Sequence, residues 1–77
     1  MNAIRRKFLA NILDRLSSIK AEIDELKDLE QEAFDNLPEG IQGSERGEKI
    51  QANVEIMDDA VNSIDDLEEQ IGELLDA

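Results

Sequence analysis

The side chains that could do chemistry in this chain are carboxylates, amines and four serines, because it has no histidine, cysteine or tyrosine. Without these residues the chain lacks the usual general base near neutral pH, the usual thiol nucleophile and a phenolic acid. No neighbouring base in the sequence could activate the serines. The sequence therefore predicts no catalytic residues and a protein that is not an enzyme.

Motifs for metals and cofactors are missing as well. A di-iron helical bundle needs Glu-x-x-His, and a zinc-thiolate site needs cysteine. The stretch from Gly40 to Gly43 follows no predicted strand and lacks the Lys-Ser/Thr ending of a phosphate-binding loop. No stretch has the spacing of a calcium loop. We therefore expect neither a metal nor a cofactor.

Eight polar residues are candidates for contacts with a ligand or a partner. Three of them form a basic run near the start, which could bind phosphate or an acidic partner, although pairing with the acidic second half is the simpler interpretation. The other five surround a group of glycines, where the polar density exceeds what a chain reversal requires and indicates a recognition loop or helix caps. The candidates are Arg5, Arg6, Lys7, Asn36, Gln42, Ser44, Arg46 and Lys49.

The elements that would position these residues are divided by the only clustered helix breakers in the chain. Pro38 has no N–H group and keeps the preceding residue out of the α region, so a helix should end just before it. Gly40 and Gly43 allow positive φ, which lets the chain reverse. Ser44 can cap a following helix by accepting a hydrogen bond from a free N–H group. We predict a helix over about 2–36, a turn over 37–44 and a helix over about 45–76.

Apolar residues before this turn recur in alternating steps of three and four, which is typical of a coiled-coil helix. Two helices of similar length joined by a short turn predict an antiparallel hairpin, an all-α, coiled-coil-like fold in one domain, 1–77. The first helix would pack through Leu9, Ile12, Leu16, Ile19, Ile23 and Leu26.

After the turn, three neighbouring columns of apolar residues make a face that is broader than one partner helix covers. A chain of 77 residues is also in the range where one core is marginal and self-association supplies the missing burial. We therefore predict that two hairpins dimerise into a four-helix bundle. The predicted oligomer interface is Ile50, Val54, Met57, Ala60, Val61, Ile64, Leu67, Ile71 and Leu74.

The net charge is −12, from 20 acidic and eight basic residues, and it disfavours direct binding to nucleic acid or to an anionic membrane. Residues 1–20 carry a net charge of +4 and residues 21–77 carry −16, so antiparallel pairing would bring opposite charges together. The expected neighbours are Arg5 and Arg6 with Glu73 and Asp76, and Arg15 with Asp65 and Asp66.

No apolar run is long enough for a membrane span or a signal-peptide core, and there is no cysteine for a disulfide. These features predict a protein of the cytoplasm that does not enter membranes.

The turn and its flanking helices resemble the short acidic helical-hairpin proteins of bacterial phages and prophages. The resemblance covers nearly the whole chain, and its weight lies in the turn, because many unrelated hairpins share acidic Leu/Ile-rich helices. It implies a phage accessory protein that acts on the host or its defences, with no activity or binding residue assigned. The residues that carry it are Asn36-Leu37-Pro38-Glu39 and Gln42-Gly43-Ser44-Glu45-Arg46-Gly47-Glu48-Lys49.

We therefore interpret the chain as a non-enzymatic, self-associating interaction protein of the phage accessory type, which binds a host protein or counters host defence. Two alternatives stay open. In one, an oligomer sequesters a small anionic, nucleotide-like ligand with basic residues gathered at subunit junctions. In the other, the acidic end of the chain imitates the phosphate backbone of a nucleic acid. The residues of that acidic run are Asp65, Asp66, Glu68, Glu69, Glu73 and Asp76.

Overall fold

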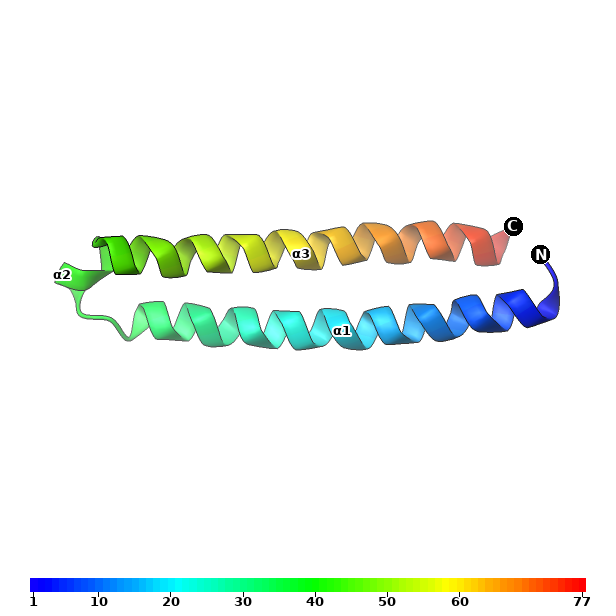
Figure 1. Ribbon diagram of the computed structural model, residues 1–77, viewed down its shortest axis with the longest axis horizontal. Coiled ribbons are helices and arrows are strands. Elements are labelled where there is room, and N and C mark those ends of the chain that lie inside the picture. Colours follow the sequence, from blue (N-terminus) through cyan, green and yellow to red (C-terminus); the bar gives the residue numbers. More distant parts are fainter.

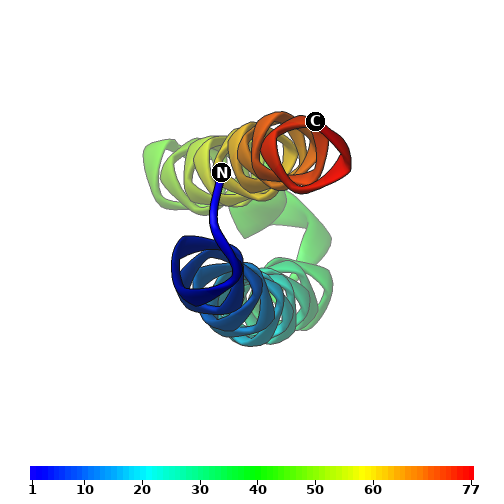
Figure 2. The same ribbon diagram turned by 90° about the vertical axis from the view of Figure 1, so that its right-hand side faces the viewer.

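The computed structural model describes all 77 residues, which form two long helices joined by a short helical turn (Figure 1). Helix α1 spans Ala3–Asp35, α2 spans Glu39–Gln42 and α3 spans Glu45–Asp76. The long helices lie side by side, so both termini are at one end of a rod that measures 59 × 15 × 12 Å (Figures 1 and 2). The predicted all-helical hairpin is confirmed.

Local sequence explains where α1 begins and ends. The Asn2 side chain accepts a hydrogen bond of 2.9 Å from the Arg5 backbone N–H and so caps the first turn. At the other end the Asn36 N–H donates to the Glu32 carbonyl over 3.0 Å, and Pro38 follows two residues later. Because proline cannot continue the ladder of hydrogen bonds, the helix stops there.

The chain reverses through the single helical turn of α2, within the range 37–44 where the sequence predicts only a turn. Pro38 precedes this helix with φ of −56°, and Gly43 follows it with φ of −84°. No residue of the chain has positive φ, so the expected left-handed conformation of Gly40 and Gly43 is wrong. Ser44 does stand at the start of α3, but its hydroxyl donates to the Ile41 carbonyl and does not cap the helix.

Gly47 fixes how closely α2 and α3 approach each other. It is one of two buried residues in the chain, and a Cβ atom at this position would lie 2.1 Å from the Gln42 carbonyl oxygen. Only glycine fits such a close contact between backbones. The Gln42 side chain closes the turn from the other side by donating to the carbonyls of Leu37 (3.2 Å) and Phe34 (3.4 Å).

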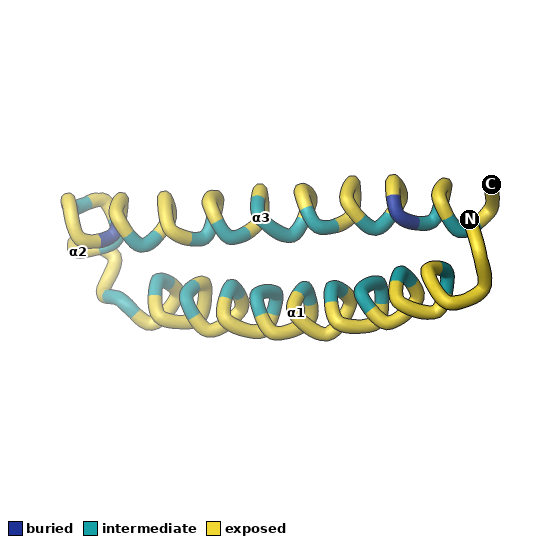
Figure 3. The backbone as a smooth tube through the Cα atoms, turned by 45° about the vertical axis from the view of Figure 1, so that its right-hand side comes forward, coloured by how far each residue is buried: buried dark blue, intermediate teal, exposed yellow.

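The least exposed residues of each long helix face the other helix and recur in steps of three and four (Figure 3). We call these two rows the seam. Ile71, with 8% of its surface exposed, is the only buried hydrophobic residue in it. The seam consists of Leu9, Leu13, Leu16, Lys20, Ile23, Lys27, Glu30 and Phe34 on α1, and of Gly47, Ile50, Val54, Met57, Val61, Ile64, Glu68, Ile71 and Leu75 on α3.

The predicted packing stripe of α1 is partly wrong. Leu9, Leu16 and Ile23 lie in the seam, but Ile19 and Leu26 remain 45% and 56% exposed. Two lysines take their places opposite α3. The side of α1 that faces α3 is therefore offset by one residue from the predicted apolar stripe at these two positions.

Candidate interaction surface

Most of the exposed hydrophobic residues gather on one side of the hairpin. Residues seven positions apart lie on the same side of a coiled helix, and four such columns flank the seam on this side. Leu26 and Leu29 of α1 line one open groove together with Asn53 and Ile56 of α3, so the columns of the two helices share a side. We call this surface the apolar face. It consists of every seventh residue from 5 to 33 and from 8 to 29 on α1, and from 46 to 74 and from 49 to 70 on α3.

Ten of these 18 positions are apolar. Several of them are largely open to solvent, including Phe8 at 67%, Ile56 at 65% and Leu29 at 57%. A continuous exposed apolar surface with polar residues around it marks an interaction site in soluble proteins. The apolar members are Phe8, Ile12, Ile19, Leu26, Leu29, Ala33, Ile56, Ala60, Leu67 and Leu74.

Acidic residues avoid the apolar face. Of the 20 acidic residues only Glu22 lies in its columns, whereas four of the eight basic residues do, and none of those four makes an ion pair. The face thus carries a net charge of +3 on a chain of −12. The four basic residues are Arg5, Arg15, Arg46 and Lys49.

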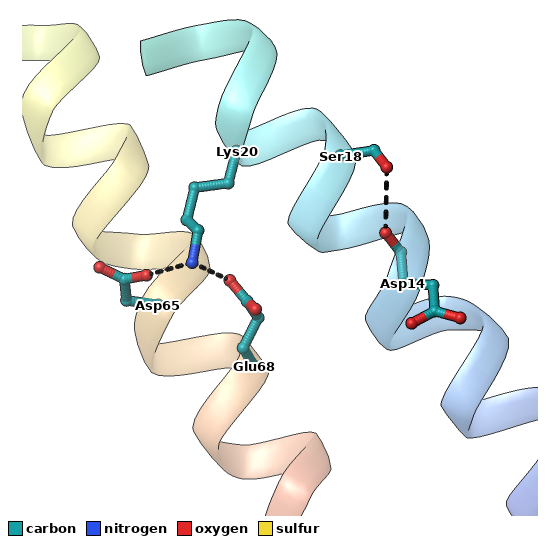
Figure 4. Close-up of polar contacts among 5 residues, drawn as sticks. All are labelled: Asp14, Ser18, Lys20, Asp65 and Glu68. Carbon is teal, nitrogen blue, oxygen red and sulfur yellow. Dashed lines mark hydrogen bonds and ion pairs between the residues drawn. The ribbon is translucent and has the colours of Figure 1, made fainter.

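The opposite side of the seam, which we call the polar face, holds the ion pairs that cross between the helices. Lys20 Nζ lies 2.8 Å from Asp65 Oδ1 and 2.7 Å from Glu68 Oε1 (Figure 4). The hydrogen bond to Asp65, followed by the contact with Glu68, raises the pKa of Lys20 well above its ordinary value. Glu68 Oε1 is buried and has no hydrogen bond of good geometry, so the charge of Lys20 is what compensates it.

Lys27 repeats this arrangement about two turns along α1. Its Nζ lies 3.0 Å from Asp24 Oδ1 in its own helix and 3.3 Å from Asp58 Oδ1 in α3. The hydrogen bond to Asp24, with a further one to Asp58, raises the pKa of Lys27. The two lysines therefore direct α1 toward the acidic polar face of α3.

The basic residues near the start do not form the ion pairs expected from the sequence. Arg6 donates hydrogen bonds to the backbone carbonyls of Leu75 and Ala77 at the end of the chain. Arg5 and Arg15 form no ion pair, and of the four expected carboxylates only Asp65 is paired, with Lys20. Arg5 and Lys7 are exposed.

The candidate residues of the turn have separate positions. Gln42 and Ser44 use their polar atoms to bond backbone carbonyls of the turn, and Asn36 follows the last residue of α1. Arg46 and Lys49 are exposed on the apolar face. Since the basic run lies at the other end of the rod, the structure does not gather the eight candidates into one site (Figure 1).

The predicted oligomer interface divides between two surfaces. Ala60, Leu67 and Leu74 lie on the apolar face, whereas the other six residues lie in the seam against α1. Sequence reasoning missed Phe8, Leu29 and Ile56 as members of an interaction surface, because they lie outside the predicted packing stripe. The six residues in the seam are Ile50, Val54, Met57, Val61, Ile64 and Ile71.

Two further observations bear on chemistry. No group of three or more acidic side chains is placed to hold a metal ion. In the acidic run, Asp65 and Glu68 are already paired with Lys20, which leaves fewer free carboxylates for imitation of a phosphate backbone.

Neither long helix combines the length and the apolar character that crossing a membrane requires.

Comparison with known proteins returns no match for this chain among protein families, curated proteins or solved structures.

Proposed function

We propose that this chain is a non-enzymatic interaction protein that works through its apolar face. The observation that carries the proposal is the composition of this face, where ten of 18 positions are apolar and one is acidic, on a chain with 20 acidic residues. If the 20 acidic residues were distributed evenly over the 77 positions, more than one of them would fall on these 18 positions. An apolar surface that is kept clear of acids is suited to burial against another helix.

Self-association is the first part of the proposal: two hairpins cover each other's apolar faces and form a four-helix bundle. The seam of one hairpin contains a single buried hydrophobic residue, so a lone hairpin has little core. Both helices carry apolar columns beyond those that face each other, as expected for helices with two neighbours. The acids, which repel between copies, lie almost wholly on the other surfaces.

Sedimentation equilibrium tests this part. We expect the wild-type chain to be a dimer at tens of micromolar and its melting temperature to rise with concentration, since folding and association would share one surface. Leu26→Lys, which places a charge on the apolar face, should give a monomer. Ser18→Lys adds the same charge at an exposed position outside this face and should leave the dimer intact. A wild-type monomer, or a Leu26→Lys dimer of unchanged affinity, would refute self-association.

The second part of the proposal is biological and is supported by the resemblance of the turn to phage hairpin proteins. We propose an accessory protein that acts in the cytoplasm of a bacterial host by binding a host protein. Affinity capture from host lysate should return a protein with the wild-type chain and not with the Leu26→Lys variant. Equal recovery with both would show that host binding does not require the dimer formed through the apolar face.

A further inference from the structure

We infer that the two copies pack through their apolar faces in opposite directions, so that the turn of each copy lies beside the termini of the other. This inference rests on the proposed self-association and adds its orientation and its contacts. Two arrangements let both copies cover their faces with antiparallel neighbouring helices. The turns lie at the same end in one and at opposite ends in the other. The distribution of charge along the rod and the positions of Arg15 and Glu22 select the second.

The distribution of charge along the rod is very uneven. The end with the termini, residues 1–20 and 63–77, holds five basic and seven acidic residues, a net charge of −2. The end with the turn, residues 21–62, holds three basic and 13 acidic residues, a net charge of −10. Turns at the same end would place −10 beside −10, whereas turns at opposite ends place −10 beside −2. Repulsion between like charges therefore favours opposite ends.

The order of side chains on α1 is complementary to itself when one copy is reversed. In that arrangement α1 lies along α1 of the second copy, with the two-fold axis beside Ile19. Arg15 then faces Glu22 of the second copy, twice in the dimer, and these are the two charged residues of their column. With turns at the same end, Arg15 and Glu22 would face neutral residues, Gln70 and Ser63, of α3 in the second copy.

Apolar residues of α1 also meet under this axis. Phe8 faces Leu29 of the second copy, and Ile12 faces Leu26, while Ile19 meets its own copy. Turns at the same end would likewise pair apolar residues, Leu29 with Ile56 and Ile19 with Leu67, so the charges are what distinguish the two arrangements. The hydrogen bond from Asn53 to Glu30 sets the register of the two helices, and in this register Ile64 is level with Ile19. The axis therefore passes beside Ile64 on α3. Ala60 of each copy then faces Leu67 of the other copy. A small residue thus lies opposite a large one, which favours close packing of the helices.

Cysteine cross-linking tests the orientation cleanly, because the chain has no cysteine of its own. Under mild oxidation Ile19→Cys should form a disulfide-linked dimer, since the two thiols meet at the axis. Leu26→Cys alone should not, because its two copies would be about 21 Å apart along the helices, far beyond disulfide reach. A mixture of Ile12→Cys and Leu26→Cys chains should form the mixed disulfide. Ser18→Cys, on the outer side of α1, gives the background from random collision.

A charge swap provides a second measurement. Arg15→Glu should raise the dimer dissociation constant about tenfold, because it turns two opposite-charge contacts into repulsive ones. Adding Glu22→Arg should restore most of the affinity, since the pair is then reversed and intact. With turns at the same end the two substitutions would not compensate each other.

These results separate the orientation from self-association itself. Suppose that sedimentation shows a dimer, but that neither Ile19→Cys nor the mixture of Ile12→Cys and Leu26→Cys cross-links faster than Ser18→Cys. This result overturns the orientation and leaves the proposed function standing. A wild-type monomer overturns both. Cross-linking at Ile19, together with rescue by the charge swap, supports the arrangement with turns at opposite ends.

Discussion

The two long sides of the hairpin differ sharply, although the same two helices form both. The polar face carries every ion pair between α1 and α3, whereas the apolar face carries none and is mostly hydrophobic. The difference arises because Lys20 and Lys27 occupy seam positions, and their ammonium groups reach Asp65 and Asp58 on one side only. Pairing within the hairpin thus uses charge on one side and leaves hydrophobic surface on the other.

This division shows what each side can contribute. Partly exposed ion pairs add little stability, but they oppose sliding or rotation of one helix against the other, since each lysine needs its own carboxylates. Hydrophobic surface stabilises only when it is buried, and here most of it is exposed. We infer that the polar face fixes the register of the hairpin and that the apolar face gains its stabilising role on association.

The largest expected effect is at the seam that both sides share. Ile71→Ala should lower the free energy of unfolding by about 2–4 kcal/mol, because it removes buried methyl and methylene groups and leaves a cavity. Ile4→Ala, at a residue that is 69% exposed and outside both the seam and the apolar face, should change it by less than about 0.5 kcal/mol. Urea unfolding measures both. Equal losses would contradict the assigned seam.

The turn gives the next largest effect, and it tests whether the two sides stay aligned. Gly47→Ala should destabilise the chain by about 1–3 kcal/mol, because the added methyl group overlaps the Gln42 carbonyl and forces α2 away from α3. Gly72→Ala is the matched control, since nothing lies within 4 Å of a Cβ atom at that helical position. That change should stabilise α3 by about 0.5–1 kcal/mol. Thermal unfolding measures both variants. A lower melting temperature for Gly47→Ala and a higher one for Gly72→Ala would confirm the close contact.

The sequence was sufficient for the broad fold and insufficient for the rotation of α1. Helical periodicity and the breakers around Pro38 predict two helices and a reversal, because these signals are local. Two stripes of α1 share Leu9, Leu16 and Ile23. One adds only apolar residues and the other adds two lysines, and the hydrophobic pattern favours the apolar stripe. The structure selects the stripe with lysines, because their stems cover apolar surface while their charged ends bind carboxylates of α3. That selection depends on the partner helix and cannot be read from α1 alone.

The candidate site shows the same limit. Ala60, Leu67 and Leu74 were predicted as interface residues from the width of the second helix, and they lie on the apolar face. The contribution of α1 to this face follows only from the rotation of that helix. Gly47 is a further example, because in the sequence it is only a gap in the capping pattern, whereas in the fold it is a contact between α2 and α3.

The Lys27→Glu variant tests the ion pairs of the polar face. Lys27 lies outside the packing stripe predicted for α1, and on a solvated surface the reversal of its charge would cost little. The structure places it between Asp24 and Asp58, so a carboxylate there would face two others at close range. We expect a clear loss of stability at low salt that shrinks as salt screens the repulsion. Lys7→Glu, at an exposed position without an acidic partner, is the control and should have little effect.

The smallest effect concerns the pH dependence of the Lys20 contacts. Their partners raise the pKa of Lys20 in the folded chain, so the protonated amine is favoured by folding. The resulting stabilisation is fully present below the ordinary lysine pKa of 10.5 and is lost as pH rises through the higher folded pKa. The difference in unfolding free energy between wild type and Lys20→Met should therefore stay constant from pH 7 to about 10 and narrow only above that range. A gap that narrows between pH 7 and 9 would show that Lys20 is not held protonated by Asp65 and Glu68, and would remove the polar face as the cause of the register.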